Sequence, residues 1–513
     1  MANRVASLKS IVSHAKKYGY VFPSSEIYDG LSAVYDYGQN GVALKDNIKR
    51  YWWKAMVQLN ENIEGLDAAI FMHPTTWQAS GHVDAFSDPL IDNRDTQKRY
   101  RADGLIEDYI AELDRKIQGA CSRAAKRFGS DFDMALYERT NPRVKEYIEQ
   151  RDKARRKMVD ALERDDLEAL TKLIADLGIA DPVSGSKNWT DVRRFNLMFG
   201  TQLAASPDSS ADLYLRPETA QGVFVNFLNV QKTARQKLPF GIAQVGKAFR
   251  NEITARQFIF RMREFEQMEL QYFVRPGDGL KHYEAWKEKR MRWHLSLGLG
   301  QENYRFRDHD KLAHYADAAS DIEFRFPFGF KELEGIHSRT DFDLRNHEKY
   351  ANKKLQFFDP LRKAHYLPHV VETSVGLDRL FLAVFSIALQ EETLADGSMR
   401  TVLRLPPILA PTQAAILPLV KKDGLPEIAR ALFGDLKYDF NVRLDDKDAI
   451  GRRYRRQDAA GTPYCITIDH DTRQDQSATL RNRDTMQQAR MPLTQIAAFL
   501  DARISMKAHL KKL

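Results

Sequence analysis

The apolar and polar positions divide the chain into two kinds of segment. Short apolar and aromatic runs, bounded by Gly, Pro, Asn or Asp, are typical of β-strands. They occur at 68–72, 213–215, 241–245 and 269–274. Because these runs have hairpin-like spacing and do not alternate regularly with helices, the pattern favours an antiparallel sheet over a doubly wound one. The predicted fold class is therefore α+β.

A long stretch between these runs has a helical pattern instead. Residues 105–177 contain two glycines and one proline, and their apolar residues recur at helical spacing among many charged ones. A helix of this composition usually presents a solvated face, although a projecting one can contact a polyanion. Residues 1–17 have the pattern of an amphipathic first helix, with a transit peptide as the alternative.

Prolines at 406, 407 and 411 mark the main domain boundary. Beyond them, strand-like and helix-like segments alternate as in a small α/β domain. The predicted organisation is a first domain in two parts, 1–103 and 186–403, interrupted by a charged helical insertion at 104–185 and followed by an α/β domain at 404–513.

The composition is that of a globular protein, and the distribution of charge indicates the kind of partner. The 513 residues are 43% hydrophobic, and the net charge is +8, of which the segment from 404 onward contributes +6. A basic segment of this kind suits a polyanion such as nucleic acid. Two cysteines, Cys121 and Cys465, are too few for a disulfide framework and predict a cytoplasmic protein. No apolar run reaches the roughly 18–20 residues of a membrane span, so no membrane partner is expected.

The first chemical candidate, 241–248, nearly matches the phosphate-binding loop GxxxxGK[ST]. Ala248 stands where that loop needs a hydroxyl group for Mg²⁺, and Ile242 and Val245 favour a buried strand. A P-loop ATPase is therefore the least favoured function.

The next segment, 249–269, combines arginines, aromatic residues and carboxylates. A strand period of two places the following residues on one face: Arg261, Arg263, Phe265, Gln267 and Glu269. Such a face suits a nucleotide whose base stacks on Phe265 and whose phosphates pair with Arg250 and Arg261. Spacing alone leaves an exposed sheet face with charge pairs as an equal alternative.

Three segments resemble the signature motifs of the class II aminoacyl-tRNA synthetases. Phe249-Arg250-Asn251-Glu252 with 265–269 resembles motif 2, Val375-Gly376-Leu377-Asp378-Arg379 resembles motif 3, and Pro74 resembles the motif 1 proline, which ends a strand at the dimer interface. Further segments resemble the homodimeric glycyl-tRNA synthetase family: 23–28 with 35–38, 215–222, and 450–454 with Asp458. The resemblance implies a catalytic domain on an antiparallel sheet, a C-terminal domain that binds the anticodon, and a homodimer.

The resemblance also implies a reaction: glycine and ATP give glycyl-adenylate and pyrophosphate, and glycine then passes to the 3′ end of tRNA(Gly). The catalytic residues would be Arg250 at the α-phosphate, Glu252 near the base, and Arg379, which with Phe265 encloses the adenine. Arg379 and Arg261 would neutralise the outer phosphates, and Glu332 or Glu372 would bind Mg²⁺. The implied ATP-binding set is Arg250, Asn251, Glu252, Phe260, Arg261, Met262, Arg263, Glu264, Phe265, Glu332, Leu333, Gly376, Leu377, Asp378 and Arg379.

Glycine has no side chain to hold, so selection has to come from a space too small for a methyl group. In the family, carboxylates that map to Glu218, Glu269 and Glu372 bind the α-ammonium group, and no editing domain is expected. Taken alone, Glu218 also fits a carboxylate at a helix start. The implied glycine-binding set is Arg101, Glu218, Phe265, Glu266, Gln267, Met268, Glu269, Glu372, Thr373, Ser374, Val375 and Gly376.

The chain departs from the family at several positions. Where many bacterial relatives carry two CxxC pairs resembling a zinc ribbon, this sequence has oxygen-bearing side chains: Asn93, Thr96, Asp181 and Ser184. These are poor zinc ligands, so we predict no zinc and a module held by packing or hydrogen bonds. Gln39-Asn40 replaces Pro-Leu, and Thr373 replaces a proline beside the expected glycine site.

Four arginines of the C-terminal domain are the expected tRNA contacts: Arg452, Arg453, Arg455 and Arg456. The main alternative to a glycine–tRNA ligase is a noncatalytic, nucleic-acid-binding relative with the same fold. Such a protein has no chemical need for Arg250, Glu252, Arg261 and Arg379, all of which are present. A synthetase for another small amino acid is disfavoured by Glu218, Glu269 and Ser374 together.

Overall fold

The structure is a computed structural model that describes residues 6–129, 132–203, 211–253, 257–309, 312–313, 315–394 and 396–511. The chain forms two compact units. One comprises Met1–Ser80, Gly200–Arg250 and Arg256–Leu513, and the other comprises Gly81–Phe199 and Asn251–Ala255. Within the described residues, no helix combines the length and the apolar character needed to cross a bilayer.

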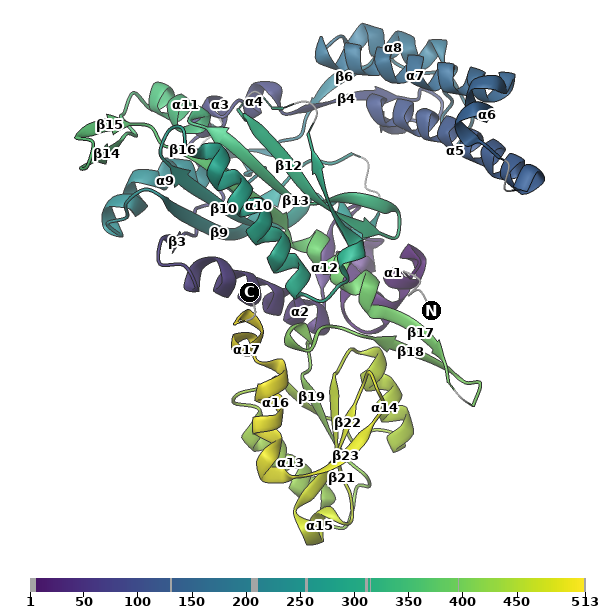
Figure 1. The fold of residues 1–513 in the computed structure, drawn as a ribbon, viewed down its shortest axis with the longest axis vertical. Coiled ribbons are helices and arrows are strands. Elements are labelled where there is room, and N and C mark those ends of the chain that lie inside the picture. Colours follow the sequence, from purple (N-terminus) through teal and green to yellow (C-terminus); the bar gives the residue numbers. More distant parts are fainter. Residues whose placement is uncertain are drawn as a thin grey trace. The chain divides into compact units, whose positions relative to one another are not determined.

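The first unit contains a seven-stranded sheet in the order β11-β12-β13-β16-β10-β9-β3 (Figure 1). All neighbouring strands are antiparallel except β3 and β9, which are parallel. This confirms the predicted antiparallel sheet and α+β class. The strands are β3 (Ile63–Gly65), β9 (Phe240–Phe249), β10 (Glu264–Val274), β11 (Tyr304–Asp308), β12 (Ala318–Phe326), β13 (Gly329–Thr340) and β16 (His369–Gly376).

The two faces of this sheet have different coverings. Helices α2 (Gln39–Trp53), α10 (Gly279–Ser296) and α12 (Leu377–Ala388) contribute to the main hydrophobic core with alternate residues of β10, including Met268 and Leu270. On the opposite face, α9 (Ala220–Thr233) and α11 (Phe342–Ala351) pack around Phe273 of β10. Because side chains alternate along a strand, residues 265, 267, 269 and 271 lie on the same face as Phe273.

Residues 241–248 lie inside β9, which confirms the strand and excludes a phosphate loop there. A Cβ at Gly246 would lie 2.3 Å from the Arg216 guanidinium, so this glycine makes room for a buried arginine. Arg216 donates to the carbonyl groups of Lys247 (2.6 Å) and Ala68 (2.8 Å). The expected strand at 68–72 does not form, and only Phe71 makes an isolated bridge, with Leu215.

Shorter elements complete the sheet domain. Pro74 is the first residue of α3 and does not end a strand.

The amphipathic helix that the sequence predicts near the N-terminus forms as α1. The remaining elements are α1 (Leu8–Lys17), β1 (Val21–Pro23), β2 (Tyr35–Tyr37), α3 (Pro74–Ala79), β7 (Gly200–Leu203), β8 (Ala211–Tyr214), β14 (Phe357–Asp359), β15 (Ala364–Tyr366), β17 (Leu389–Thr393) and β18 (Met399–Leu403), a π-helical turn at Lys54–Gln58, and 3₁₀ turns at Glu26–Tyr28, Phe258–Phe260, Gln301–Asn303 and Pro407–Leu409.

The second unit contains the predicted helices and is wider than 104–185, since it begins at Gly81 and reaches Phe199. Apolar residues of α5, α7 and α8 form its core, among them Ile106, Met158 and Leu170. Its elements are α4 (His82–Ala85), β4 (Ser87–Asp92), β5 (Arg99–Arg101), α5 (Ala102–Phe128), α6 (Met134–Thr140), α7 (Pro142–Glu163), α8 (Leu167–Asp176) and β6 (Arg193–Asn196).

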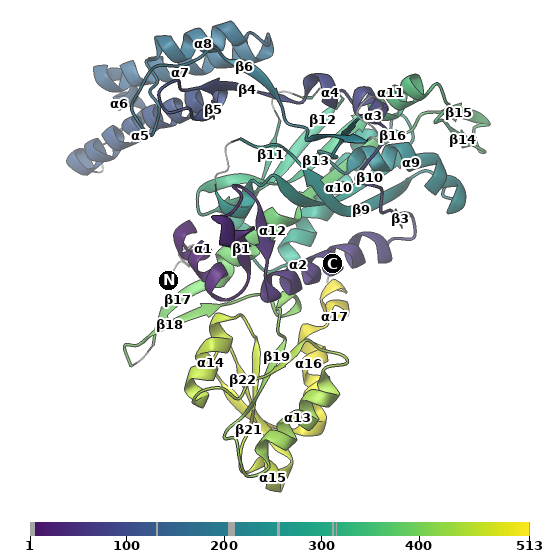
Figure 2. The same ribbon diagram turned by 180° about the vertical axis from the view of Figure 1, so that it is seen from behind.

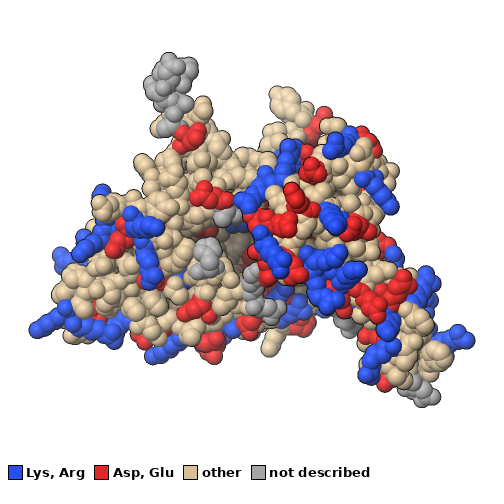
Figure 3. Space-filling view, turned by 90° about the horizontal axis from the view of Figure 1, so that it is seen from above, with Lys and Arg blue, Asp and Glu red and all other residues tan. Residues whose placement is uncertain are grey.

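The C-terminal segment forms the predicted α/β domain around a five-stranded sheet, β20-β19-β21-β22-β23. Helices α13 and α16 pack on one face of it and α14 on the other (Figure 2). The elements are β19 (Ala414–Pro418), α13 (Leu425–Leu436), β20 (Val442–Leu444), α14 (Ile450–Ala459), β21 (Tyr464–Ile468), α15 (Thr472–Asp475), β22 (Ser477–Asn482), β23 (Gln488–Pro492), a 3₁₀ turn at Leu493–Gln495, α16 (Ile496–Ile504) and α17 (Met506–Leu510). Basic and acidic side chains are interspersed on the face in Figure 3, in keeping with the small net charge of +8.

The four positions that replace the zinc-ribbon cysteines lie together in the second unit, joined by hydrogen bonds. Asp181 accepts from Thr96 (2.7 Å) and Ser184 (3.0 Å), and also from the Tyr100 hydroxyl (2.6 Å). The Asn93 side-chain oxygen accepts from the Thr96 N–H at 3.2 Å. Of the two predicted means of holding this module, packing or hydrogen bonds, hydrogen bonds join these four side chains. Burial raises the pKa of Asp181, but the donors around it outweigh this effect and hold that pKa well below its usual range.

Replacing Asp181 by Ala would leave Thr96, Ser184 and Tyr100 without their shared acceptor. We expect this to destabilise the second unit by about 1–3 kcal/mol, the usual cost of unpaired buried polar groups. Hydrogen–deuterium exchange of residues 81–199 measures the loss of protection. The matched control is Asp176→Ala at the exposed end of α8, for which we expect a change below about 0.5 kcal/mol. Equal protection in both variants would contradict the role of Asp181.

Candidate active site

The uncovered part of the polar sheet face carries acidic and amide side chains from two neighbouring strands. Glu269 of β10 pairs with Ser374 of β16, and Gln271 pairs with Glu372. Gln267 donates to the Ser374 hydroxyl at 3.2 Å. Four of the residues expected to bind glycine are therefore brought together: Gln267, Glu269, Glu372 and Ser374.

Glu269 is a buried carboxyl group at the centre of this face. It is 2% exposed, and it accepts hydrogen bonds from the Thr219 hydroxyl and from Gln271 (2.6 Å). Burial raises its pKa, and the nearby carboxylates of Glu372 and Glu218 raise it further, to well above the usual range. Arg339 lowers the pKa of Glu269, but less than burial and the two carboxylates raise it.

Glu372 has the opposite electrostatic environment. Its carboxylate contacts His337 Nδ1 (2.8 Å) and accepts from Arg339 (3.0 Å) and Gln271 (2.7 Å). Burial raises the pKa of Glu372, but Arg339 and His337 more than compensate and lower it well below its usual range. Both of its oxygens are already engaged by this chain's own donors.

Arg339 is the buried cation of this region. It donates to both oxygens of Asp343 (2.8 and 2.9 Å) as well as to Glu372, and its guanidinium lies 4.1 Å from the centre of the Tyr315 ring. Gln221 in turn donates to Asp343 (3.2 Å) and Glu218 (2.9 Å). We define the carboxylate cluster as Glu218, Glu269, Asp343 and Glu372.

The carboxylate cluster has an excess of negative charge, because two arginines, Arg339 and Arg216, face four carboxyl groups. Two buried oxygens beside it, Oε1 of Gln267 and Oε1 of Gln271, have no hydrogen-bond partner within the described residues. Acceptors and carboxylates together suit a small cationic group with several N–H donors, such as an ammonium group.

The residues expected to bind ATP occupy the neighbouring part of the sheet. The Arg250 guanidinium lies 5.2 Å from the centre of the Phe265 ring. Arg379, just after β16, lies 4.5 Å from the centre of the Phe260 ring and forms a salt bridge with Glu332 (3.1 Å). The charge of Arg379 lowers the pKa of Glu332, whose side chain is 52% exposed. The two arginines thus each lie over an aromatic ring.

Other residues of the expected ATP and glycine sets have different surroundings. Arg261 and Arg263 precede β10, which begins at Glu264, so they do not continue its face. The side chains of Phe260, Met262, Met268, Leu333, Val375 and Leu377 belong to the hydrophobic core, and the alternation of β16 puts Thr373 on that side too. Thr373 therefore lies on the face of β16 opposite to Ser374. Glu264 is paired with Lys247, and Gly376 is the last residue of β16.

Three predicted residues, Arg101, Asn251 and Glu252, belong to the second unit. There Arg101 forms salt bridges with Asp88 (3.0 Å) and Asp103 (2.6 Å). Among the four C-terminal arginines, Arg453 does not fit the predicted tRNA contact. It is 2% exposed and donates to the carbonyl groups of Pro418 (2.6 Å) and Leu419 (3.0 Å), which gives it a structural role.

Sequence reasoning missed a buried cation that joins the two ATP motifs. Lys45 of α2 forms salt bridges with Glu266 of β10 (2.6 Å) and Asp378 of α12 (2.9 Å). Asp378 also accepts from the Glu266 backbone N–H (2.8 Å) and from the Tyr37 hydroxyl. Glu266 follows Phe265, and Asp378 precedes Arg379, so Lys45 fixes the two segments that carry these residues. Lys45 is so far in sequence from Glu266 and Asp378 that no local pattern predicts these salt bridges.

The structure allows a test of the metal prediction from the donor set. Within the described residues, no group of three or more His, Cys, Asp or Glu side chains is arranged to hold a metal ion. Glu372 does not fit Mg²⁺, because its oxygens are engaged by Arg339, His337 and Gln271. Glu332 fits better, since its side chain is half exposed and Mg²⁺ needs only one or two carboxylates when phosphates complete its coordination.

Comparisons with known proteins extend these observations. A family model described as "Glycyl-tRNA synthetase insertion domain 1" matches residues 88–197, and one described as "Anticodon binding domain" matches residues 413–503. The chain is 49% identical over 498 residues to the glycine–tRNA ligase of Chlorobaculum tepidum, covering 97% of this chain and 100% of the relative. It is 47% identical to the glycine–tRNA ligases of Macrococcus caseolyticus (97% and 99% covered) and Geobacillus thermodenitrificans (98% and 98% covered).

The antiparallel sheet, the inserted helical unit and the C-terminal anticodon-binding domain define a class II aminoacyl-tRNA synthetase. Relatives of this identity align along nearly the whole chain. The chain therefore belongs to the glycine–tRNA ligase family and is an enzyme of that class, as the sequence motifs predicted.

Replacing Lys45 by Met would leave the buried Asp378 carboxylate without its cation and Glu266 with only the more distant Lys49 (3.6 Å). We expect a loss of about 3–5 kcal/mol in the free energy of unfolding, since an uncompensated buried charge is costly. Denaturant unfolding of the intact chain measures it. The control is Lys49→Met one turn later in α2. The Lys49 side chain is 30% exposed and lies 3.6 Å from Glu266, so its loss costs under about 1 kcal/mol. Equal losses would contradict the role of Lys45.

Proposed function

We propose that this chain activates glycine with ATP, giving glycyl-adenylate and pyrophosphate, and then transfers the glycyl group to the 3′ end of tRNA(Gly). The observation that carries the proposal is the carboxylate cluster, whose excess negative charge lies next to Phe265 and the Arg250 that covers it. The glycine–tRNA ligases that cover nearly all of this chain support the same reaction.

The carboxylate cluster would bind the α-ammonium group of glycine. Glu269 and Glu218 supply negative charge, and the unpartnered oxygens of Gln267 and Gln271 supply acceptors. Glu372 acts through Arg339 and Gln271, which it holds in place. Ser374, opposite Glu269, would border the α-carbon, so that a larger amino acid clashes there and no editing is needed. We propose that Arg101 binds the substrate carboxylate.

In the first step, a carboxylate oxygen of glycine attacks the α-phosphorus of ATP. A new oxygen–phosphorus bond forms, the bond to the bridging oxygen breaks, and pyrophosphate leaves with that electron pair. Arg250 would neutralise charge on the α-phosphate, while Arg379 and Arg261 neutralise the leaving phosphates. Glu252 would bind near the adenine, which stacks on Phe265. No protein nucleophile is required, because the chain orients the two substrates and stabilises the developing charge.

In the second step, a terminal ribose hydroxyl of tRNA attacks the carbonyl carbon of glycyl-adenylate. The new ester bond forms, the bond from that carbon to the phosphate oxygen breaks, and AMP leaves with that electron pair and takes up the hydroxyl proton. In the first step, Glu332 would hold Mg²⁺ together with the phosphates of ATP, and the ion would supply positive charge to the leaving pyrophosphate. We also propose that the protein is a cytoplasmic homodimer. The resemblance of 23–28, 35–38 and 215–222 to the homodimeric glycyl-tRNA synthetases supports the dimer, and the two buried, unpaired cysteines support the reducing compartment.

Pyrophosphate exchange into ATP, measured with each standard amino acid and without tRNA, tests the proposal. We expect exchange with glycine alone. Arg379→Ala removes a phosphate-neutralising group and a surface next to the nucleotide, so we expect exchange to fall at least about 100-fold. Exchange with alanine or serine would overturn the glycine assignment, and silence with all amino acids in a folded protein would overturn the activity.

Glycine binding should release a proton. Burial and the neighbouring carboxylates hold the pKa of Glu269 well above its usual range despite Arg339, so the group is protonated below that raised pKa. A bound ammonium group favours the carboxylate and lowers this pKa, so glycine affinity weakens as pH falls below it. Calorimetry in buffers of different ionisation enthalpy counts the protons. Glu269→Gln should abolish the release, whereas the exposed Glu168→Gln should preserve it. Buffer-independent heats in the unaltered protein would contradict the assignment.

A further inference from the structure

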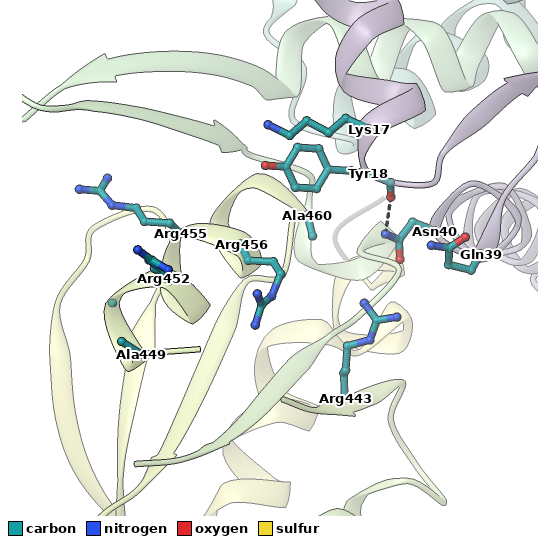
Figure 4. Close-up of a pocket in the computed structure, with 11 residues that line it drawn as sticks. Lys17, Tyr18, Gln39, Asn40, Arg443, Ala449, Arg452, Arg455, Arg456 and Ala460 are labelled. Atoms are coloured by element: carbon teal, nitrogen blue, oxygen red, sulfur yellow. Dashed lines mark hydrogen bonds between the residues drawn. The ribbon is translucent and has the colours of Figure 1, made fainter. Parts of the chain in front are cut away.

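A basic pocket lies where the N-terminal segment meets the C-terminal domain (Figure 4). Its volume is about 860 Å³, and α14 with neighbouring residues forms one wall while the end of α1 and the start of α2 form the other. The side chains that carry the argument are Lys17, Gln39, Arg443, Arg452, Arg455 and Arg456. None of the residues that line it is acidic, within the part of the chain that the structure describes.

The cations of this pocket differ in how far the protein neutralises them. Arg456 pairs with Asp445 (2.8 Å) and Asp448 (2.7 Å), so its charge is already compensated. Among the described residues, the other four side chains make no salt bridge and no side-chain hydrogen bond, and all four residues are exposed: Lys17, Arg443, Arg452 and Arg455. Arg452 and Arg455 still interact with the carboxylates of Asp448 and Asp396, so the group is only partly compensated. Its remaining positive charge suits a polyanion.

The pocket wall also contains neutral donors. Asn40 is held by its side-chain hydrogen bond to the Tyr18 carbonyl (2.7 Å), and this contact fixes the start of α2 against the end of α1. The exposed Gln39 amide beside it offers an N–H donor of the kind that binds phosphate oxygens. Figure 4 shows the Arg443 side chain extending toward Asn40 and Gln39 from below.

We propose that this pocket binds the ribose–phosphate backbone of an RNA strand, and that side chains from both walls of the pocket contact the same strand. The proposal rests on the proposed function, because it takes the RNA to be the tRNA substrate. Exposed cations on three separate segments suit an extended chain of phosphates better than one compact anion. Arg443, Arg452 and Arg455 lie within the matched anticodon-binding region, whereas Lys17 and Gln39 lie outside it.

This arrangement divides the predicted tRNA contacts by role. Arg452 and Arg455 contact the backbone, Arg453 supports the fold, and Arg456 holds the loop around Asp445. Lys17 and Arg443 join the contact set although no tRNA-binding motif includes them. Backbone contacts position an RNA without reading its sequence, so this pocket contributes affinity and not base identity.

The test compares two variants with the same loss of charge. The pocket variant carries Lys17→Gln, Arg452→Gln and Arg455→Gln. The control carries Lys422→Gln, Arg430→Gln and Arg473→Gln, which are exposed residues of the C-terminal domain outside the pocket. The dissociation constant of a tRNA(Gly) transcript is measured at several salt concentrations. We expect the pocket variant to lower the slope of log affinity against log salt by about three, roughly one per lost phosphate contact, and the control by less than about one.

Several outcomes would overturn the proposal. Equal slopes in the two variants would show that the backbone contact lies elsewhere. Displacement of the transcript from the unaltered protein by inorganic tripolyphosphate, at equal phosphate concentration, would show that the pocket binds a compact anion as well as it binds an extended strand. If the triple variant unfolds at a lower temperature than the unaltered protein, the single variants Lys17→Gln and Arg455→Gln take its place. Each has an expected slope change of about one. Glycine-dependent pyrophosphate exchange of the unaltered protein is measured in parallel. Its absence would overturn the proposed function, whereas unchanged slopes with normal exchange would overturn the pocket alone.

Discussion

The burial of several carboxyl groups on one face of a β-sheet is the constraint around which the catalytic half is organised. An isolated carboxylate in such a place is strongly unfavourable, and proteins respond with paired cations or with protonation. Both responses occur here. Arg339 neutralises Asp343 and Glu372, while the pKa of Glu269 is raised. The same sheet offers its other face to the hydrophobic core, so a shift of one residue in β10 would exchange Glu269 for the core residue Met268 or Leu270.

A second buried charge connects this face to the helix layer. Lys45 reaches from α2 to Glu266 and Asp378, whose chain neighbours are Phe265 and Arg379. The Asp378 carboxylate also holds the Glu266 N–H, so strand β10 and the start of α12 are tied by both charge and backbone bonding. Two segments over 100 residues apart in sequence thus acquire a fixed separation, which any ligand held between them requires.

Much of the fold follows from local pattern, and the exceptions have identifiable causes. The apolar runs at 241–245 and 269–274 lie in β9 and β10 as predicted. The run at 68–72 does not form a strand, because the carbonyl of Ala68 accepts a hydrogen bond from the Arg216 guanidinium. The face expected to begin at Arg261 begins at Glu264, since a 3₁₀ turn with Gln257 and Phe258 at positive φ precedes it. At the site, the family resemblance pointed to Glu218, Glu269 and Glu372, but not to Asp343 or Arg339, which form an i,i+4 pair that looks like an ordinary surface ion pair in the sequence. Lys45 escaped notice because its partners are distant along the chain.

The chemistry of the hydrogen-bonded module around Asp181 decides which chemical conditions affect this part of the second unit. Its four central side chains are carboxylate, amide and hydroxyl groups, none of which is oxidised by peroxides or withdrawn by a chelator. A cross-link of thiolates and zinc depends on both metal supply and a reduced thiol pool. In this chain the same corner is closed by hydrogen bonds between groups that contain no sulfur, so these bonds themselves depend neither on zinc supply nor on the thiol pool.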